Sequence, residues 1–166
     1  MDWLMPVALS VGLIVLIFFM IWRGWRGRAA RQSDVGPLPA VPADGGAQLC
    51  EVEGQYVVST TSGDWLDRIA VHGLGAKSQA VAVVLTSGIH FVRTGAPDVF
   101  IPVNAIAAVH CSSGMAGKFV EKDGLVIVSW RLGEHLLDTG FRTRHAMERN
   151  TLRDAIESIF QDEGQL

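Results

Sequence analysis

The fold class is decided by residues 125–160, which read LVIVSWRLGEHLLDTGFRTRHAMERNTLRDAIESIF. Residues 125–131 are almost continuously apolar, Gly133 marks a turn, and residues 135–141 form a second short apolar run, so the stretch begins as a β-hairpin. After Phe141 the apolar period changes from 2 to 3.6, which predicts an amphipathic helix over residues 143–161 with Thr143 as its N-cap. The apolar stripe of this helix is made of Leu152, Ala155, Ile156, Ile159 and Phe160.

Upstream of this stretch, short apolar runs separated by turn residues predict further strands over residues 49–61, 78–86, 89–94, 99–102 and 106–111. Regular spacing with hairpin-type turns favours an antiparallel barrel or sandwich over alternating strands and helices. One segment departs from the pattern: residues 64–69 predict a short helix with Leu66 and Ile69 facing inward and Ser62 near its N-cap.

Seven strands followed by one C-terminal amphipathic helix is the element order of a pleckstrin-homology (PH) barrel, in which the helix closes an open corner. An eight-stranded lipocalin-like barrel is the alternative. We expect Phe160 and Ile156 to close the open end, with Met147 outside the stripe and Trp130 in the core. The predicted fold class is therefore an N-terminal transmembrane helix plus a mainly β, PH-like seven-stranded barrel or roll capped by a helix.

The N-terminus carries the strongest apolar signal, because the 20 residues from Trp3 to Trp22 contain no charged side chain. A helix of that length spans about 30 Å, the thickness of the hydrocarbon core of a bilayer. Trp3, Trp22 and Trp25 lie at its two ends, where aromatic rings prefer the membrane interface. An acidic start at Asp2 and the length of the apolar run argue against a cleaved signal peptide.

Four arginines follow this segment, namely Arg23, Arg26, Arg28 and Arg31. Positive charge on the C-terminal side predicts an N-out, C-in orientation, so the rest of the chain would face the cytoplasm from the cell (inner) membrane. These arginines can also contact anionic headgroups at the membrane interface. Two unpaired cysteines, Cys50 and Cys111, are compatible with a reducing compartment.

Residues 23–48 are interpreted as a basic juxtamembrane segment and a Pro/Gly-rich linker that is extended and poorly ordered. The predicted domain covers residues 49–161, and residues 162–166 are a tail. Removing the four arginines and one aspartate of residues 1–31 from the chain's 14 basic and 17 acidic residues leaves 10 and 16, a net charge of −6. This balance argues against nucleic-acid binding and against a polybasic lipid-binding module.

Several segments together resemble one family: Thr60-Thr61-Ser62-Gly63-Asp64-Trp65-Leu66-Asp67-Arg68, His72-Gly73-Leu74-Gly75, Gly114-Met115-Ala116-Gly117-Lys118 and Asp138-Thr139-Gly140-Phe141-Arg142. With the predicted anchor and linker, the chain resembles an actinobacterial group of small single-pass membrane proteins with a bacterial PH-like domain. The resemblance covers nearly the whole chain and implies that fold and a membrane location. Members are often labelled only membrane protein, export protein or transporter, and their genes tend to lie among pyrimidine-biosynthesis genes. The family supplies no catalytic residues.

Two glycine-rich stretches, residues 73–78 and 114–118, have the composition of phosphate-binding loops. Both fail the Walker A spacing and follow no parallel strand, so loops at one end of a barrel are the simpler interpretation. Backbone N–H groups beside Lys77 or Lys118 could still hold an anion weakly.

Metal and catalytic chemistry find no support in the motifs. His110 and Cys111 are adjacent on a strand and point to opposite faces, and neither C-x-x-C nor H-x-x-x-H spacing occurs. His145 is interpreted as a packed histidine on the extension of the helical stripe. We expect no enzyme activity, no catalytic residue, no metal and no cofactor.

The possible ligand or partner surface consists of Trp65, Arg68, Lys77, Lys118 and Arg142. Trp65 lies between Asp64 and Asp67, which favours a surface position. The basic start of the C-terminal helix, made of Arg142, Arg144, Arg149 and Arg153, is either a solvated face or a partner patch.

The function expected from these features is a non-enzymatic, membrane-tethered module that brings a protein or a small anionic ligand to the inner face of the membrane. One alternative is an accessory subunit of a membrane transport or export complex whose transmembrane helix makes the recognition. Another is a lipid-headgroup sensor, but residues 56–78 contain only Arg68 and Lys77 against Asp64 and Asp67, so we expect no strong lipid binding. A homodimer through Ala8 and Gly12, which have small-xxx-small spacing, is weakly supported.

Overall fold

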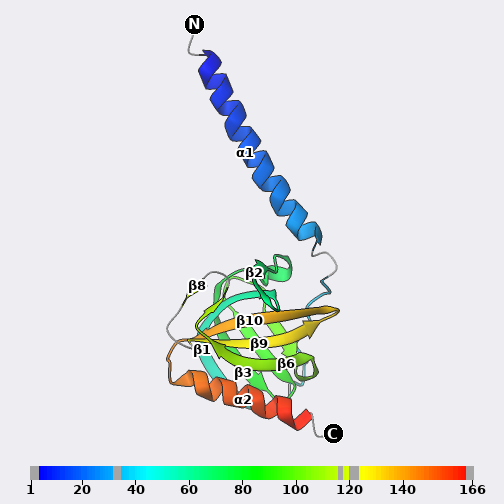
Figure 1. The fold of residues 1–166 in the computed structure, drawn as a ribbon. Coiled ribbons are helices and arrows are strands. Elements are labelled where there is room, and N and C mark those ends of the chain that lie inside the picture. Colours follow the sequence, from blue (N-terminus) through cyan, green and yellow to red (C-terminus); the bar gives the residue numbers. More distant parts are fainter. Residues whose placement is uncertain (1–3, 32–34, 116–117, 120–123, 164–166) are drawn as a thin grey trace. The chain divides into compact units, whose positions relative to one another are not determined.

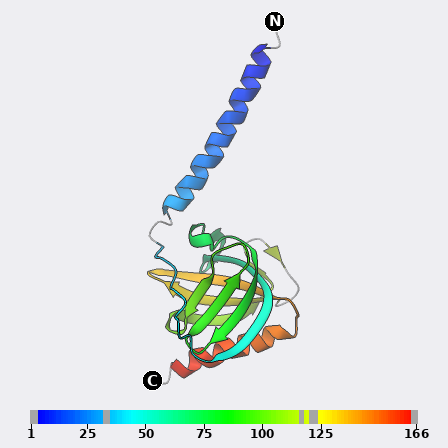
Figure 2. The same cartoon turned by 180° about the vertical axis from the view of Figure 1, so that it is seen from behind.

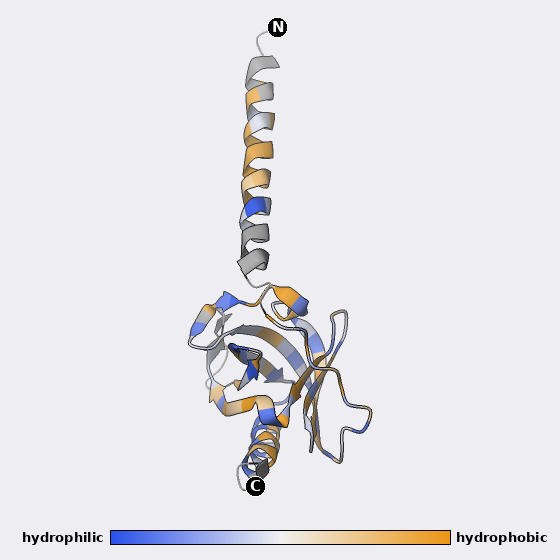
Figure 3. Ribbon diagram, turned by 90° about the vertical axis from the view of Figure 1, so that its right-hand side faces the viewer, coloured by the Kyte–Doolittle hydropathy of each residue, from blue (hydrophilic) through white to orange (hydrophobic). Residues whose placement is uncertain are grey.

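The computed structural model describes residues 4–31, 35–115, 118–119 and 124–163, and it forms two compact units, Met1–Asp34 and Val35–Leu166. The first unit is helix α1 (Leu4–Arg31). Its described side chains between Val7 and Gly24 are all exposed; Figure 3 shows the apolar part of α1 in orange. Within the part of the chain that the structure describes, no helix combines the length and apolarity needed to cross a membrane. The membrane span predicted over residues 3–22 therefore stays a prediction.

The second unit is built on one antiparallel sheet in the order β5-β4-β3-β1-β10-β9-β6, with β2 paired to β1 (Figures 1 and 2). Its strands are β1 (Gln48–Thr61), β2 (Asp64–Arg68), β3 (Ser78–Leu85), β4 (Gly88–Arg93), β5 (Val99–Pro102), β6 (Ile106–Ser112), β9 (Leu125–Leu132) and β10 (His135–Thr143). A two-stranded sheet of β7 (Gly114–Met115) and β8 (Lys118–Phe119) lies apart from it. All the strands predicted from the sequence are present.

The sheet is not closed, which corrects the barrel form of the fold prediction. The short helix η2 (Val103–Ala105) carries the chain from β5, at one edge of the sheet, to β6, at the other edge. The sheet ends at β5, which pairs with β4, and at β6, which pairs with β9. The architecture is therefore a bent, open roll.

Strand β1 bends the sheet by belonging to both of its halves. Its first part pairs with β3 from Gln48 to Tyr56, and its second part pairs with β10 from Gly54 to Thr61. A register shift between Tyr56 and Val58 marks the bend. Gly54 is needed here because a Cβ atom would collide with the carbonyl oxygen of Arg142.

Helix α2 (Glu148–Glu163) packs against β1, β6 and η2 and covers an open end of the roll (Figure 1). Leu152 and Ile156 are 1% exposed and Ile159 is 5% exposed, so the predicted stripe does enter the core. Phe160 is only partly buried against that core. Trp130 is completely buried, as predicted.

The predicted start of this helix is wrong. Thr143 still belongs to β10, where it pairs with Gly54, and its hydroxyl donates a hydrogen bond to the carbonyl oxygen of His145. The chain needs four more residues before α2 begins at Glu148, so His145 is exposed instead of packed. Met147 is 89% exposed, as the stripe predicted.

The helix predicted over residues 64–69 is also wrong. Gly63 adopts a φ of 82°, which allows a tight turn after β1, and the chain returns as strand β2. Leu66 is 65% exposed, against the prediction, whereas Ile69 is buried as predicted. Hairpin pairing of Thr60 with Arg68 provides the backbone hydrogen bonds that a helix would otherwise supply.

Residues 35–47, which the sequence analysis assigned to the linker, contact the rest of the second unit at several points. Val35 is 5% exposed in the core cluster, and its carbonyl oxygen lies 3.2 Å from Nε2 of His72. Further along, the Ser87 hydroxyl donates to the carbonyl oxygen of Gly45 at 2.7 Å. These contacts attach the segment to the second unit, whose compact part therefore begins at Val35.

Candidate functional site

A groove with a volume of about 740 Å³ lies across the outer face of the sheet, on the side opposite the core. It crosses β10, β1, β3 and β4, and the connection between β10 and α2 forms one wall. It is lined by Glu53, Gly54, Gln55, Gln79, Ala80, Val81, Val92, Thr94, Arg142, Thr143, Arg144 and Ala146. Because strand side chains alternate between faces, every second residue of these strands points into the groove.

One row of side chains across the groove runs from positive through negative to apolar. The amide N–H of Arg144 donates to the carbonyl oxygen of Glu53 at 2.8 Å, which places the two residues opposite each other. Glu53 pairs with Val81, and Val81 pairs with Val92. The row is therefore Arg144, Glu53, Val81 and Val92, and it spans three strand spacings, or about 14 Å.

A second row lies beside the first and is polar throughout. Arg142 pairs with Gln55, and Gln55 pairs with Gln79. The amide N–H of Thr94 donates to the carbonyl oxygen of Gln79 at 2.9 Å, so Thr94 ends the row. Both arginines lie at the same end of the groove, because Arg142 belongs to β10 and Arg144 directly follows that strand.

The Arg144–Glu53 ion pair is solvated. Its N···O distance is 2.8 Å, and the two side chains are 67% and 64% exposed. Ion pairs with this exposure contribute only about 0–1 kcal/mol. Arg144 can therefore exchange Glu53 for another anion at low cost.

Arg93 is a buried cation, since only 6% of it is exposed. Its guanidinium donates to the Ser78 hydroxyl at 2.9 Å and to the carbonyl oxygens of Gly73, Ala76 and Pro97 at 3.1, 2.5 and 3.1 Å. It also lies 4.0 Å from the centre of the Tyr56 ring, a cation–π distance. Burial lowers the pKa of Arg93, and the Tyr56 and Asp98 charges oppose that shift.

Tyr56 begins a chain of hydrogen bonds through the core. Trp130 Nε1 donates to the Thr139 hydroxyl at 2.8 Å, Thr139 and Ser59 are joined at 2.6 Å, and Ser59 and Tyr56 at 2.6 Å. The Tyr56 hydroxyl donates to the carbonyl oxygen of Leu74 at 3.3 Å. Burial raises the pKa of Tyr56 to about 12, against smaller opposing effects of Ser59, Arg93 and Thr139.

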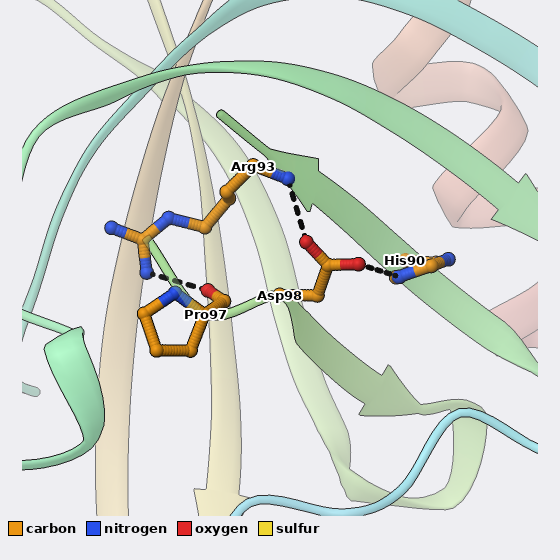
Figure 4. Close-up of polar contacts among 4 residues, drawn as sticks. All are labelled: His90, Arg93, Pro97 and Asp98. Atoms are coloured by element: carbon orange, nitrogen blue, oxygen red, sulfur yellow. Dashed lines mark hydrogen bonds and ion pairs between the residues drawn. The ribbon is translucent and has the colours of Figure 1, made fainter. Parts of the chain in front are cut away.

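His90 and Asp98 form a second polar cluster, at the turn between β4 and β5 (Figure 4). One carboxylate oxygen of Asp98 accepts from the Arg93 amide at 2.8 Å, and the other lies 3.1 Å from Nε2 of His90. Figure 4 shows the Arg93 side chain pointing away from this carboxylate toward Pro97. Both oxygens of Asp98 are occupied in holding the turn, which makes this cluster structural.

The glycine-rich stretch 73–78 is ordered by Arg93 and does not form a phosphate cradle. A cradle needs N–H groups that point at the anion, whereas here the carbonyl oxygens of Gly73 and Ala76 point at the guanidinium. The amide N–H of Ala76 is bonded to the Gly73 carbonyl oxygen. Lys77 is exposed beside this loop.

In the other glycine-rich stretch, Met115 is described and is only 3% exposed. Met115 belongs to a small apolar cluster with Val57, Val58, Leu125 and Ile127. A Cβ atom at Gly140 would lie 2.6 Å from the Met115 sulfur, so this glycine makes room for the contact.

Three of the five residues predicted as a ligand or partner surface have described side chains. Arg142 lies in the groove, Arg68 lies on β2 opposite Thr60, and Lys77 precedes β3. Trp22 and Arg23 are exposed on α1. Trp3 lies outside the described residues, and the side chains of Trp25, Arg26, Arg28, Arg31, Trp65 and Lys118 also lie outside the description.

Sequence reasoning missed Glu53, Gln55 and Gln79 as site residues. They are polar residues at outward positions of predicted strands, which is an ordinary pattern. Only the register of β1 with β3 and β10 shows that they lie beside Arg142 and Arg144.

Among the described residues, no group of three His, Cys, Asp or Glu side chains is placed to hold a metal ion. Both cysteines are free and half-buried. Burial raises the pKa of the Cys50 thiol, and the nearby Glu148 carboxylate raises it further. Cys50 is therefore a protonated thiol at neutral pH, the opposite of what a nucleophilic cysteine requires.

Comparison with known proteins identifies the domain. The sequence model of a family described as "Bacterial PH domain-like" matches residues 35–157. The chain belongs to this family. The match begins at Val35, the residue at which the second compact unit begins. The comparison with curated proteins finds no match.

The chain is also similar to several solved structures at low sequence identity. A chain of "The 8S snRNP Assembly Intermediate" is 8% identical, with a TM-score of 0.50 over 75% of this chain and 88% of that chain. The C-terminal domain of an unknown protein from Leishmania infantum is 16% identical, with a TM-score of 0.44 over 70% and 86% of the two chains. A Vav1 structure is 15% identical, with a TM-score of 0.43 over 82% of this chain and 32% of that one. Only the first of these likenesses reaches a TM-score of 0.50, and at 8% identity it bears on the fold alone.

Proposed function

We propose that the PH-like domain is a non-enzymatic interaction module that binds a partner in the outer-face groove and is tethered to a membrane by the N-terminal helix. The observation that carries the proposal is the groove itself, which places two arginines, two glutamines and two valines on one accessible surface. A PH-like fold suits a protein or lipid interaction module.

The burial of the residues with shifted pKa values supports a binding function over a catalytic one. Tyr56 and Arg93, whose pKa values are shifted by burial, are engaged in hydrogen bonds that hold the core and its loops. Catalytic groups with perturbed pKa values normally face a cleft, where they reach a substrate. The charged residues of the groove, Glu53 and Arg144, are instead exposed and paired with each other.

Membrane tethering is supported by α1 and by the sequence around it. The 20 residues from Trp3 to Trp22 lack charge, and the large apolar side chains described along α1 are 47–73% exposed. A helix that is apolar on all sides requires an apolar environment. The four arginines that follow favour a cytoplasmic domain at the inner membrane, as in the actinobacterial single-pass proteins that the sequence resembles.

Two measurements test the tether and its orientation. The chain should stay in the membrane pellet after alkaline extraction, and a C-terminal reporter that is active only in the periplasm should remain silent. Release by alkali would contradict the tether, and strong reporter activity would contradict the orientation.

The binding function is tested by photo-crosslinking in intact cells. A photoreactive residue at Gln79, inside the groove, should give a discrete adduct, and one at Glu134, exposed between β9 and β10 and not part of the groove lining, should not give that adduct. The adduct at position 79 should weaken when Arg142 and Arg144 are both changed to Gln. Identical adducts from both positions would mean that the groove is not the binding face.

The exposed apolar side chains of α1 also favour a second candidate, an accessory subunit of a membrane transport or export complex recognised through that helix. Replacing residues 4–22 with an unrelated apolar helix separates the two candidates. The groove proposal expects the adduct at Gln79 to survive the exchange, and the alternative expects it to disappear.

A further inference from the structure

We infer that the groove takes an extended peptide segment in which an acidic side chain lies three or four residues from an apolar side chain. This inference rests on the proposed binding function and adds to it the chemistry of the partner. It follows from the graded polarity of the two side-chain rows, from the weak pairing of Arg144, and from the openness of the site.

The polarity of the groove gives the order of groups in the partner. Arg142 and Arg144 lie at one end, Gln55 and Gln79 lie in the middle, and the apolar end includes Val92, which is 41% exposed. A partner that matches this order places a carboxylate at the arginine end, hydrogen-bonding backbone groups over the glutamines, and an apolar side chain at the valine end.

The length of the groove sets the spacing in the partner. The centre of the apolar end lies two to three strand spacings from the arginines, which is about 10–14 Å. An extended peptide advances about 3.3 Å per residue, so three or four residues cover that distance.

The charge state of the groove favours an added carboxylate. Glu53 and Arg144 form an exposed pair at 2.8 Å, and Arg142 lies in the neighbouring row on the same side. The groove lining therefore includes two positively charged residues and one negatively charged residue, and a carboxylate from the partner matches the sign of the arginine end. Glu53 competes for Arg144, so its removal should strengthen binding.

The exposure of the lining favours a peptide over a small anion. Sites for small molecules bury most of the ligand surface, with a few enclosed polar groups. Here the Arg144 and Glu53 side chains are 67% and 64% exposed, so the groove contacts a ligand from one side only. A partner segment that is held at both ends by its own protein suits such a surface.

The test uses the 166-residue chain in mild detergent and a displayed library of random eight-residue peptides. Enriched peptides should contain Asp or Glu three or four positions from an aliphatic or aromatic residue. One enriched peptide, labelled for fluorescence anisotropy, should bind the Arg144→Gln and Arg142→Gln variants about tenfold more weakly, a typical effect of losing a charge-assisted contact. Glu53→Gln should bind it more tightly.

Arg131→Gln is the matched control, because Arg131 is exposed on β9 outside the groove lining. It makes the same charge change and should leave the affinity unchanged. Equal thermal midpoints of the variants confirm that they remain folded. Inorganic phosphate and phosphatidylglycerol vesicles, added as competitors, should not displace the peptide at physiological salt.

Three results would overturn the inference. These are a library without acidic enrichment, an enriched peptide that binds Arg144→Gln and Arg131→Gln equally, or full displacement by phosphate or by the vesicles. The photo-crosslink from Gln79 is independent of the peptide library. If that adduct forms although the library fails, the proposed binding function stands and only the chemistry of the partner is wrong.

Discussion

The ionisation of Tyr56 is the most direct test of the buried series of hydrogen bonds, because the protein contains a single tyrosine. Its phenol is completely buried and is joined to Ser59, to the Leu74 carbonyl oxygen and, through Ser59, to Thr139. Burial raises its pKa from 10.0 to about 12, although the Arg93 charge beside the ring opposes the shift. Tyrosinate absorbance in an alkaline titration therefore reports on this one residue.

The direction of the linked stability change follows from the two pKa values. Below pH 10 the phenol is protonated in both states, so its contribution to stability is fully present. Between pH 10 and 12 the unfolded chain loses this proton while the folded domain keeps it, which favours unfolding as the pH rises. A shift of about two units corresponds to about 3 kcal/mol, lost across this pH range.

The assay compares tyrosinate absorbance with tryptophan fluorescence, which reports folding, during titration of the 166-residue chain. We expect little tyrosinate at pH 10.5 in the folded protein, with ionisation either near pH 12 or together with unfolding. In concentrated denaturant the midpoint should return to about 10. Tyr56→Phe should flatten the fall in stability between pH 10 and 12. If the tyrosinate titration has its midpoint near pH 10 while the fluorescence stays native, Tyr56 is solvated and the buried series of hydrogen bonds is refuted.

The remaining predictions concern stability and are measured by urea denaturation. Arg93→Met should destabilise the domain by about 3 kcal/mol because buried carbonyl oxygens lose their donors, whereas Arg93→Lys should lose less and the exposed control Arg131→Met should change little. With an m-value of about 1–3 kcal/mol/M, the Arg93→Met midpoint should fall by at least about 1 M, and an unchanged midpoint would contradict the network. Ile156→Ala should cost about 2–5 kcal/mol, against less than about 0.5 for Met147→Ala; equal midpoints for these two would mean that α2 does not contribute to the core. Phe160→Ala should fall between them, because Phe160 is only partly buried.

Local patterns in the sequence predicted the elements well where side-chain periodicity reports burial directly. The strands of the main sheet and the stripe of α2 follow from periods of 2 and 3.6, and Ile156 and Trp130 are buried as those periods require. Errors occurred where a local preference competed with pairing. Residues 64–68 have helix-like spacing but pair with β1, and Thr143 resembles an N-cap but completes β10.

The candidate site could be predicted only in part. Arg142 was recognised as a surface residue, and Arg144 was considered as part of a basic face. Their position beside Glu53 and Gln55 depends on strand register. A register slip of one residue would move each side chain to the other face of the sheet. The buried role of Arg93 was missed, because an arginine at the end of a predicted strand is ordinarily exposed.

The amino-acid sequence by itself determined the succession of strands along the chain, the C-terminal helix, the apolar N-terminal segment and the membership of a PH-like class. All of these depend on residues close in the chain. Tertiary structure alone decided the open edge of the sheet, the attachment of residues 35–47 and the composition of the groove. Arg144 and Glu53, separated by 91 positions, meet because β1 bends at Tyr56 and pairs with both β3 and β10. Contacts between such distant residues depend on register and chain path, and neither quantity is encoded in the local period of a sequence.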